Sequence, residues 1–455
     1  MSESKQLHFC HDYDTTGKSQ TIVEKGSLNW LLYLAGSIFA CTLILVFTKP
    51  KGIEIGYSAI LGGIISVLVG VTTFSDVINV FYIVWNPTLT FIAIVIITMV
   101  FDESGFFTYV ASMLGRISKG NPLKLFVFII LFGAFVSAFF ANDGAALVLT
   151  PIIYWVLSNT DIPRKLYLPY IMAVGFIADT ASLPFVISNL TNILATSFFD
   201  IHFLQYAETM LIPDIVAVIT SLLVLTLMYR KSLPEKFSIV NSSGTEDTVK
   251  DRTVFRMAFP VLAILAFVYS IGGVYSIPVA IFAFPASIVI LYIARRGHKI
   301  NTGRILRDSP WQIILFSIGM YMIVYGLAEQ GLASMVANVL VRISAEPGPF
   351  NIILSGYFMS ALAAVMNNLP SIMLGNLAIK SSHLGIQYIY VNVIANDIGP
   401  KFTTIGSLAT LIWINTVKRK SGITISWKYY MGTGFILAFP VLTATLFTLW
   451  AISFL

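Results

Sequence analysis

The chain has 455 residues, of which 57% are hydrophobic and only 11% are charged. Because a soluble protein carries roughly 25% charged residues, this composition excludes a soluble enzyme, a nucleic-acid-binding protein and a disordered scaffold. The net charge of +6 is typical of a membrane protein whose basic residues lie in cytoplasmic loops. The sequence therefore predicts an all-α polytopic membrane protein embedded in a lipid bilayer.

The chain begins with a polar segment of mixed charge, 1–27. It lacks the short basic region and short apolar core of a signal peptide, and we interpret it as an N-terminal tail. The two cysteines are Cys10, in this tail, and Cys41. They are too few for a disulfide framework and too far apart for a zinc motif.

Apolar stretches follow the tail, many of them about 20 residues long, which is the length that a helix needs to cross a membrane. Two of them, 166–199 and 385–416, are longer, and polar residues, Gly and Pro interrupt both near the middle. This pattern predicts broken helices. The ten predicted spans are 28–48, 53–73, 82–103, 166–199, 208–229, 254–275, 277–294, 310–329, 385–416 and 429–451.

Two further apolar stretches, 125–158 and 350–379, each consist of two short halves around a polar tip. The tips are 142–144 (NDG) and 367–370 (NNLP). Each half has about 15 residues, too few to cross the bilayer comfortably, so we predict two re-entrant hairpins. Such tips are tolerated only where protein buries them or where they face a water-filled cavity. We expect an amphipathic helix at 333–344, before the second hairpin.

Clusters of Lys and Arg predict which loops face the cytoplasm, because these residues are enriched on that side of a membrane. The loops 230–256, 295–307 and 418–420 are basic, and so are both ends of the first hairpin. The second hairpin is flanked more sparsely by basic residues, which places its ends outside. Alternation through ten spans then puts both termini on the external side.

The order of three spans, a hairpin, a broken span and a final span occurs twice. It predicts a first inverted repeat at 28–229, a cytoplasmic linker at 230–253 and a second inverted repeat at 254–455. The two broken spans align without a gap at an offset of 218 residues, which matches Asp179 with Asp397. Inverted repeats with discontinuous helices are typical of secondary transporters, which bind substrate at the breaks.

Ionisable side chains inside a membrane are costly and are usually functional. We interpret four of them, at the first hairpin tip and in the broken spans, as proton-coupling residues: Asp143, Asp179, Asp397 and Lys401. Structural alternatives stay open, because Asp143 could cap a helix and Asp397 could form a static ion pair with Lys401. Pro400, between the two, disfavours a regular helix there.

Neutral polar residues gather around the same tips and breaks, where side-chain amides and hydroxyls can bind a hydroxylated solute. The alternative for each Ser or Thr is a hydrogen bond to its own helix. The predicted substrate-binding residues are Asn142, Gly144, Ser188, Asn189, Thr191, Asn192, Asn367, Asn368, Thr403, Thr404, Ser407 and Thr410. We expect no metal site and no cofactor, because no histidines occur at metal-ligand spacing and no phosphate-binding motif is present.

Four motifs carry a family resemblance. They are 139–151 (FFANDGAALVLTP), 188–192 (SNLTN), 367–370 (NNLP) and 399–410 (GPKFTTIGSLAT). Together they resemble the hairpin tips and unwound regions of the bacterial arsenite/antimonite efflux permeases, a family of the ion transporter superfamily. The resemblance covers nearly the whole chain from the first span onward.

This resemblance implies a multi-pass protein of the bacterial inner membrane that exports arsenite or antimonite and is coupled to inward proton movement. It also implies that the protein associates, as in some systems of the family, with a separate soluble arsenical-pump ATPase. The linker 230–253 is the natural docking surface for such a partner. The alternatives are a sodium/proton antiporter of the same superfamily, a carboxylate importer, for which Lys401 is the one interior cation, and a channel or structural subunit.

The cysteine count bears on how such a substrate is recognised. Arsenite binds thiolates strongly, and a site of three thiolates needs three cysteines. The chain has two, and neither Cys10 nor Cys41 lies near a helix break. We therefore predict that the substrate is recognised in its neutral hydroxylated form, through Asn, Ser and Thr side chains.

Overall fold

The computed structural model describes residues 30–240, 248–345 and 348–454. Regular structure in these ranges is helical, apart from an isolated bridge between Thr160 and Ile239. Eight of the described helical stretches are long and apolar enough to cross a membrane. The predicted all-α polytopic fold is confirmed. The predicted tail 1–27, with Cys10, lies outside the described residues.

The first half of the chain follows the predicted order, with one addition. Between the third span and the first hairpin lies a short amphipathic helix, α4, which buries Phe106, Phe107 and Ala111. The helices are α1 (Trp30–Thr48), α2 (Ile55–Leu68), α3 (Phe74–Glu103), α4 (Phe106–Ile117), α5 (Pro122–Phe139), α6 (Asn142–Ser158), α7 (Leu168–Thr180), α8 (Leu190–Phe198) and α9 (Phe203–Tyr229).

The second half has the same order of elements, with a short extra helix, α12, before its third span. The predicted amphipathic helix at 333–344 is confirmed as α14, and it joins α13 through a π-helical turn at Gly331. The helices are α10 (Arg252–Val274), α11 (Ala280–Arg296), α12 (Thr302–Asp308), α13 (Trp311–Leu327), α14 (Ala333–Ile343), α15 (Pro349–Met366), α16 (Asn368–Ser382), α17 (Ile386–Ile398), α18 (Leu408–Ser421) and α19 (Trp427–Ile452).

Both predicted hairpins are pairs of helices joined by very short turns, α5–α6 and α15–α16. The second turn is the single residue Asn367, which adopts a positive φ of 79° that Asn tolerates better than most residues. Both predicted broken spans are interrupted. The first unwound segment, 181–189, separates α7 from α8, and the second, 399–407, separates α17 from α18. All four features lie where length and polar breaks predict them.

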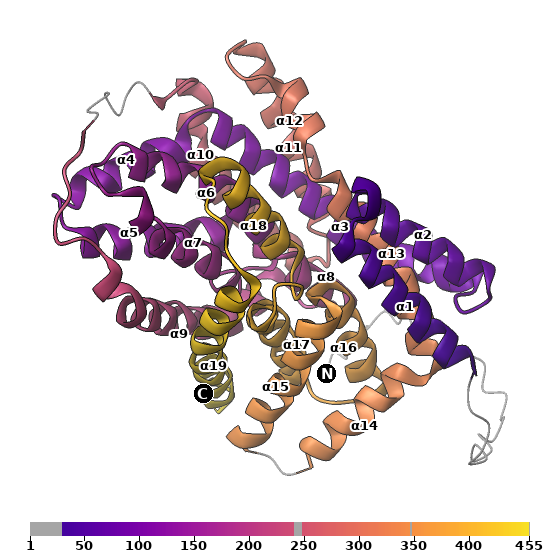
Figure 1. The fold of residues 1–455 in the computed structure, drawn as a ribbon. Helices are drawn as coiled ribbons and strands as arrows, with labels where there is room; N and C mark the ends of the chain where they lie inside the picture. Colours follow the sequence, from indigo (N-terminus) through magenta and orange to yellow (C-terminus); the bar gives the residue numbers. More distant parts are fainter. Residues whose placement is uncertain (1–29, 241–247, 346–347, 455) are drawn as a thin grey trace, which may run out of the picture.

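Helices of the two halves pack against each other in reciprocal pairs (Figure 1). The second span of each half packs against the third span of the other, α2 against α13 and α11 against α3. The second hairpin helix of each half contacts the helix after the break in the other, α6 with α18 and α16 with α8. The last helices of the halves, α9 and α19, also pack together.

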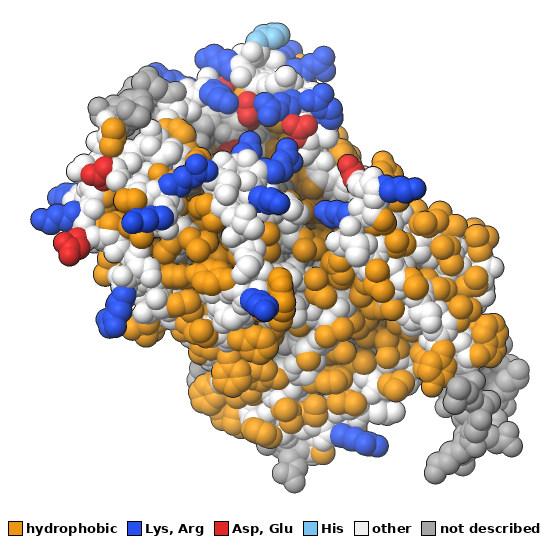
Figure 2. All heavy atoms as spheres, in the orientation of Figure 1, with side chains coloured by type: hydrophobic (Ala, Val, Ile, Leu, Met, Phe, Trp, Pro, Cys, Tyr) orange, Lys and Arg blue, Asp and Glu red, His pale blue; other side chains and the backbone are white. Residues whose placement is uncertain are grey.

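Charge is distributed unevenly over the surface. Figure 2 shows Lys and Arg gathered toward one end of the molecule, and hydrophobic side chains covering much of the remaining visible face. Large apolar side chains are exposed on the long helices, as at Phe267, which is 66% exposed, and Leu223, which is 58% exposed. Exposed apolar surface of this extent is unfavourable in water and matches a lipid environment.

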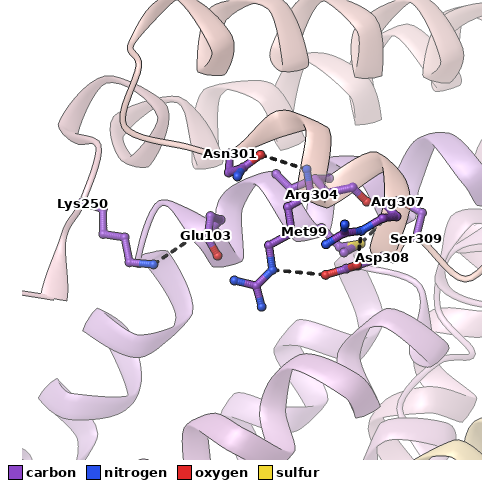
Figure 3. A network of polar contacts seen from close by, with 9 residues as sticks. Met99, Glu103, Lys250, Asn301, Arg304, Arg307, Asp308 and Ser309 are labelled. Carbon is purple, nitrogen blue, oxygen red and sulfur yellow. Dashed lines mark hydrogen bonds and ion pairs between the residues drawn. The ribbon is translucent and has the colours of Figure 1, made fainter.

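The basic end is held together by contacts between loops that are distant in sequence. The backbone N–H of Phe237 donates to the Gly120 carbonyl at 3.0 Å, and the Arg164 side chain donates to the Ser421 carbonyl. The Lys250 ammonium forms an ion pair of 3.1 Å with Glu103, at the end of α3 (Figure 3). The linker 230–253, as far as the structure describes it, is therefore fixed to the ends of membrane helices.

Candidate functional site

The first hairpin tip contacts the first broken helix through side chains. Asn142, the first residue of α6, donates from Nδ2 to Oδ1 of Asp179 at 3.1 Å. The hydroxyl of Ser188, in the first unwound segment, donates to the carbonyl of Ala138 at 2.5 Å. Asn142 and Asp179 are only 2% and 4% exposed. The tip is thus tied directly to a buried carboxyl group.

The second hairpin tip contacts the second unwound segment mainly through the backbone of that segment. Asn367 donates from Nδ2 to the Ile405 carbonyl at 3.1 Å, and the Asn368 N–H donates to the Gly406 carbonyl at 2.8 Å. The Thr403 hydroxyl donates to the Ala364 carbonyl at 2.6 Å. Carbonyl groups that a regular helix would satisfy are therefore satisfied here by the hairpin.

The two halves meet at the carboxylate of Asp397, near the end of α17. It accepts hydrogen bonds from Asn189 Nδ2 at 2.9 Å and from the Thr191 hydroxyl at 2.5 Å, both in the first half. It also accepts a longer one, 3.3 Å, from the Ser182 hydroxyl, which shares its proton with the Asp179 carbonyl at 2.7 Å. Asp397 is 1% exposed. Such a carboxylate is tolerated in the interior because its lone pairs are satisfied by donors.

Two side-chain amides, Asn189 at the end of the first unwound segment and Asn192 in α8, hydrogen-bond to backbone groups of the segment and of the first turn of α8. Asn189 accepts the Thr191 N–H and so caps α8. Asn192 donates from Nδ2 to the carbonyls of Ser182 at 2.7 Å and Phe185 at 3.1 Å. Asn192, predicted as a substrate-binding residue, therefore satisfies backbone carbonyls in this structure.

Lys401 is buried, with 1% of its surface exposed. Its ammonium donates to the backbone carbonyl of Asp397 at 3.2 Å, and it interacts electrostatically with both Asp179 and Asp397. Among the described residues, the ion pairs within 4 Å do not include Lys401. The direct Asp397–Lys401 ion pair, one alternative from the sequence, does not form because α17 ends at Ile398 and Pro400 lies in a tighter turn.

The remaining predicted residues lie around this cluster. Gly144 faces Thr98 of α3, which a side chain at this position would contact at 3.6 Å. The Thr410 hydroxyl lies 3.2 Å from the Tyr430 hydroxyl. Thr404 is half-buried in the second unwound segment, and Ser407 is buried at its end. Asp143 lies in the first turn of α6, but its side chain is outside what the structure describes.

Several residues of the polar interior were not predicted from the sequence, among them the buried amides Asn376, Asn392 and Asn396, and also Ser182 and Asp214. Ser182 donates to Asp397, and nothing in the local sequence distinguishes it from any other serine. Asp214 is 7% exposed and lies in α9, within a predicted span. The rule that singled out Asp179 and Asp397, a charge inside an apolar span, applies equally to Asp214 and could have found it.

Two cavities approach the first unwound segment. The larger, about 270 Å³, is lined by polar residues including Asn86, Asp200 and His202, and it reaches Val186. The smaller, about 20 Å³, is apolar and lies against Phe139, Phe185 and Ile187, beside the first hairpin tip. Phe203 lines both cavities, and its ring stacks on that of Phe185 with centroids 6.0 Å apart. Aromatic rings thus separate the larger cavity from the hairpin tip.

A polytopic helical fold, with ionisable groups buried where two broken helices meet, defines the class of membrane transport proteins. The profile of the family described as "Arsenical pump membrane protein" matches residues 34–453. The chain belongs to this family of arsenical transporters.

Individual relatives agree with the family match. The chain is 42% identical over 420 residues to the "Arsenical pump membrane protein" of Escherichia coli strain K12, which covers 91% of this chain and 97% of the relative. It is also 42% identical over 419 residues to the protein of the same description from Yersinia enterocolitica, with the same coverage. The family resemblance predicted from the hairpin and break motifs is confirmed.

Proposed function

We propose that the protein exports arsenite and antimonite from the cytoplasm in exchange for inward-moving protons, by alternating access. One observation carries this proposal: the buried Asp397 carboxylate of the second half accepts hydrogen bonds from Ser182, Asn189 and Thr191 of the first half. A carboxylate in that position can bind either a proton or a hydroxylated solute. Relatives described as arsenical pumps support the choice of substrate.

The chemistry of the substrate fits this site. In its neutral form arsenite carries hydroxyl groups, which donate and accept hydrogen bonds as Ser and Thr side chains do. In the proposed complex, substrate hydroxyls replace part of the donor set of Asp397, and the freed Asn189 and Thr191 bind substrate oxygens. Protonation of Asp397 removes the charged acceptor and weakens the complex. Proton and substrate therefore exclude each other, which is the requirement for exchange.

Lys401 has a supporting role in this scheme. It interacts with Asp179 and Asp397, so one ammonium offsets part of the charge of two carboxylates. Without it, two buried acids would repel each other, and at least one would have to remain protonated. Asp179 in turn accepts from Asn142, which links the charge of the site to the position of the first hairpin.

We infer that the two halves, 28–229 and 254–455, are inverted repeats. The common order of elements and the reciprocal packing of α2 on α13 and α11 on α3 support this inference. The proposed motion moves a hairpin and its broken helix against the long scaffold helices, and so exposes the site to one side at a time.

We place the basic end of the molecule in the cytoplasm and both termini outside the bacterial inner membrane, because Lys and Arg are enriched on the cytoplasmic side. The linker 230–253 belongs to this end, through the contact of Phe237 with Gly120. We propose it as the docking surface for a soluble arsenical-pump ATPase. A pull-down with the linker shortened tests this, and ATPase capture that survives the deletion contradicts it.

Growth of an arsenite-sensitive bacterial host that expresses the protein tests the proposed transport function. We expect higher arsenite and antimonite resistance and lower cellular arsenic, with sodium sensitivity unchanged. Sodium tolerance without arsenite resistance would instead support the sodium/proton antiporter alternative, which the family match disfavours. The Asp397→Asn protein, checked for equal abundance in the membrane, is the control, and we expect it to confer no resistance.

A further inference from the structure

A second buried acid lies outside the Asp397 cluster. Asp214 of α9 is 7% exposed, and its Oδ1 atom has no hydrogen-bond partner. The backbone of Leu183, in the first unwound segment, interacts with the carboxyl group of Asp214. A carboxyl group with an unsatisfied oxygen is costly in an apolar interior, so its presence in a membrane helix indicates a functional role.

Tyr206 connects this acid to the transport site. It lies about two turns before Asp214 on α9, is fully buried, and its hydroxyl also has no hydrogen-bond partner. Its ring lies beside that of Tyr390 on α17, the helix that carries Asp397, and its hydroxyl is within electrostatic range of Asp397 and Asp214. Among the described residues around this pair, the titratable groups that interact with it are therefore Tyr390 and Asp397, both on α17.

A groove leads from the surface to Tyr390, which lies next to Tyr206. Its volume is about 420 Å³, and its lining comes from the starts of α9 and α17 and the end of α19, with Glu208, Thr209 and Tyr390 among the polar residues. The rings of Tyr390 and Tyr206 have centroids 6.0 Å apart. The C-terminal end of α19 lies away from the basic end of the molecule (Figures 1 and 2), so the proposed orientation opens this groove to the outside.

We propose that Asp214 and Tyr206 form a proton-binding site on the route from this external groove to Asp397. The inference rests on the proposed function, in which protons enter from outside. Water in the groove delivers a proton to a tyrosine hydroxyl as that hydroxyl passes its own proton inward, because a hydroxyl both accepts and donates. A water molecule that enters from the groove accepts the proton from the hydroxyl and gives one of its own to the carboxylate of Asp214 or Asp397, so only O–H bonds break and form.

A purely structural role for Asp214 makes a different prediction. An acid that serves only to accept the Leu183 backbone can be replaced by Asn, whose amide oxygen accepts the same hydrogen bond. A proton carrier cannot be replaced in this way, because an amide does not exchange between charged and neutral forms. The Asp214→Asn protein therefore separates the two roles, and Tyr206→Phe tests the route while keeping the ring.

The experiment uses the full chain reconstituted in liposomes and two measurements of arsenite movement. The first is accumulation driven by a pH gradient, and the second is exchange of labelled arsenite without a gradient. For Asp214→Asn we expect driven accumulation to fall by about 10-fold or more while exchange stays within about 2-fold of wild type. Tyr206→Phe should show the same split with a smaller loss. Asp308→Asn, at an exposed acid of α12, is the matched control and should behave as wild type.

Gradient-driven accumulation by both Asp214→Asn and Tyr206→Phe at the wild-type rate would overturn this inference and leave the proposed function intact. Wild-type transport that ignores the pH gradient would overturn the proposed function itself. If Asp214→Asn does not insert, Tyr206→Phe decides alone, since it removes one hydroxyl and no packing. If Tyr206→Phe loses both exchange and driven accumulation, Tyr206 belongs to the substrate site, which contradicts the proton route.

Discussion

The two unwound segments, 181–189 and 399–407, occupy corresponding places in the two halves but carry different chemistry. The first supplies neutral donors to the central carboxylate, Ser182 and Asn189. The second follows Asp397 directly and contains the buried cation Lys401. At the offset of 218 residues, Lys401 corresponds to Leu183. A similar order of elements in the two halves therefore places a segment with a buried charge, 399–407, near a segment of neutral donors, 181–189.

The hairpin tips differ in the same sense. The first tip is bound to a side chain that can change its charge, through the hydrogen bond of Asn142 to Asp179. The second tip is bound to carbonyl groups, through Asn367 and Asn368. A change in protonation therefore reaches the first hairpin directly and the second only through movement of the backbone. We expect the first hairpin to respond to proton binding.

The largest expected effect comes from Asp397→Asn. The substitution removes the charged acceptor of three hydrogen bonds, each of which contributes about 1.5–3 kcal/mol when one partner is charged. We expect arsenite uptake into everted membrane vesicles to fall by about 100-fold or more. Asp308→Asn, at an exposed ion pair of α12, is the control and should leave uptake unchanged, because surface ion pairs contribute little. Uptake near wild type for Asp397→Asn would remove this residue from the mechanism.

Variants at Lys401 test whether the buried positive charge must lie in the second unwound segment. We expect Lys401→Met to lower uptake about 10-fold to 100-fold, because the two acids lose their shared cation. The double variant Leu183→Lys/Lys401→Leu moves the charge to the corresponding position of the first half and should not restore uptake. Rescue by the double variant would show that the site needs a cation but not this asymmetry.

The neutral donors at the first helix break should contribute to the affinity for arsenite more than to proton coupling. Thr191→Val removes a hydroxyl that donates to Asp397 and keeps the shape of the side chain, and we expect KM for arsenite to rise about 10-fold. Thr191→Ser keeps the hydroxyl and should stay within about 3-fold of wild type. Equal KM values for the Val and Ser variants, measured in the same vesicles, would count against a role for this hydroxyl.

Contact between α19 and the second unwound segment gives a smaller test. A methyl group at Gly434 would clash with the Lys401 carbonyl, whereas one at Gly432 meets open space. We expect Gly434→Ala to slow uptake about 3-fold to 10-fold, because overpacking displaces the segment that carries Lys401. Gly432→Ala, two residues earlier on the same helix, should transport as wild type. Equal rates for the two variants would show that the position of this segment has no effect on the rate.

The smallest expected effect is that of the cysteines. Cys41 lies on an exposed face of α1, far in sequence from both unwound segments. We expect the Cys10→Ser/Cys41→Ser protein to take up arsenite within about 2-fold of wild type, since soft-metal binding by thiolates plays no part in the proposed site. Lost uptake in this variant, with normal insertion into the membrane, would show that thiol groups take part in recognition.

Much of the fold follows from the sequence because membranes impose simple rules. Span length, polar breaks and short apolar halves predicted the helices of both hairpins and both helix breaks. The count of ten spans stays a prediction. Eight described stretches meet the length and hydropathy that a span needs, and two of them, α5 and α15, are hairpin helices of 18 residues, longer than the predicted halves. The helix α4 was not predicted, because its 12 residues form an amphipathic segment shorter than a span. Its counterpart α14 was predicted, since it precedes a clearly recognisable hairpin.

The candidate site could be predicted from the sequence only in part. Asp179, Asp397 and Lys401 could be singled out, because charges are rare inside spans. That Asp397 is bound by Ser182, Asn189 and Thr191 could not, since nothing in one sequence gives the register between two halves of a fold. The arrangement of Lys401 also depends on the turn at Pro400, which directs its ammonium to a backbone carbonyl instead of a carboxylate.

Competition between arsenite and protons for Asp397 is the basis of the proposed exchange, and equilibrium binding measures it directly. Equilibrium binding of arsenite to the purified protein should strengthen as the pH rises from acidic to neutral, because the substrate binds the ionised carboxylate. Binding should release protons, detected as a dependence of the binding heat on the buffer. In Asp397→Asn the remaining binding should be independent of pH and release none. Proton release of wild-type size in Asp397→Asn, or no proton release in the wild-type protein, would contradict exchange of protons and arsenite at Asp397.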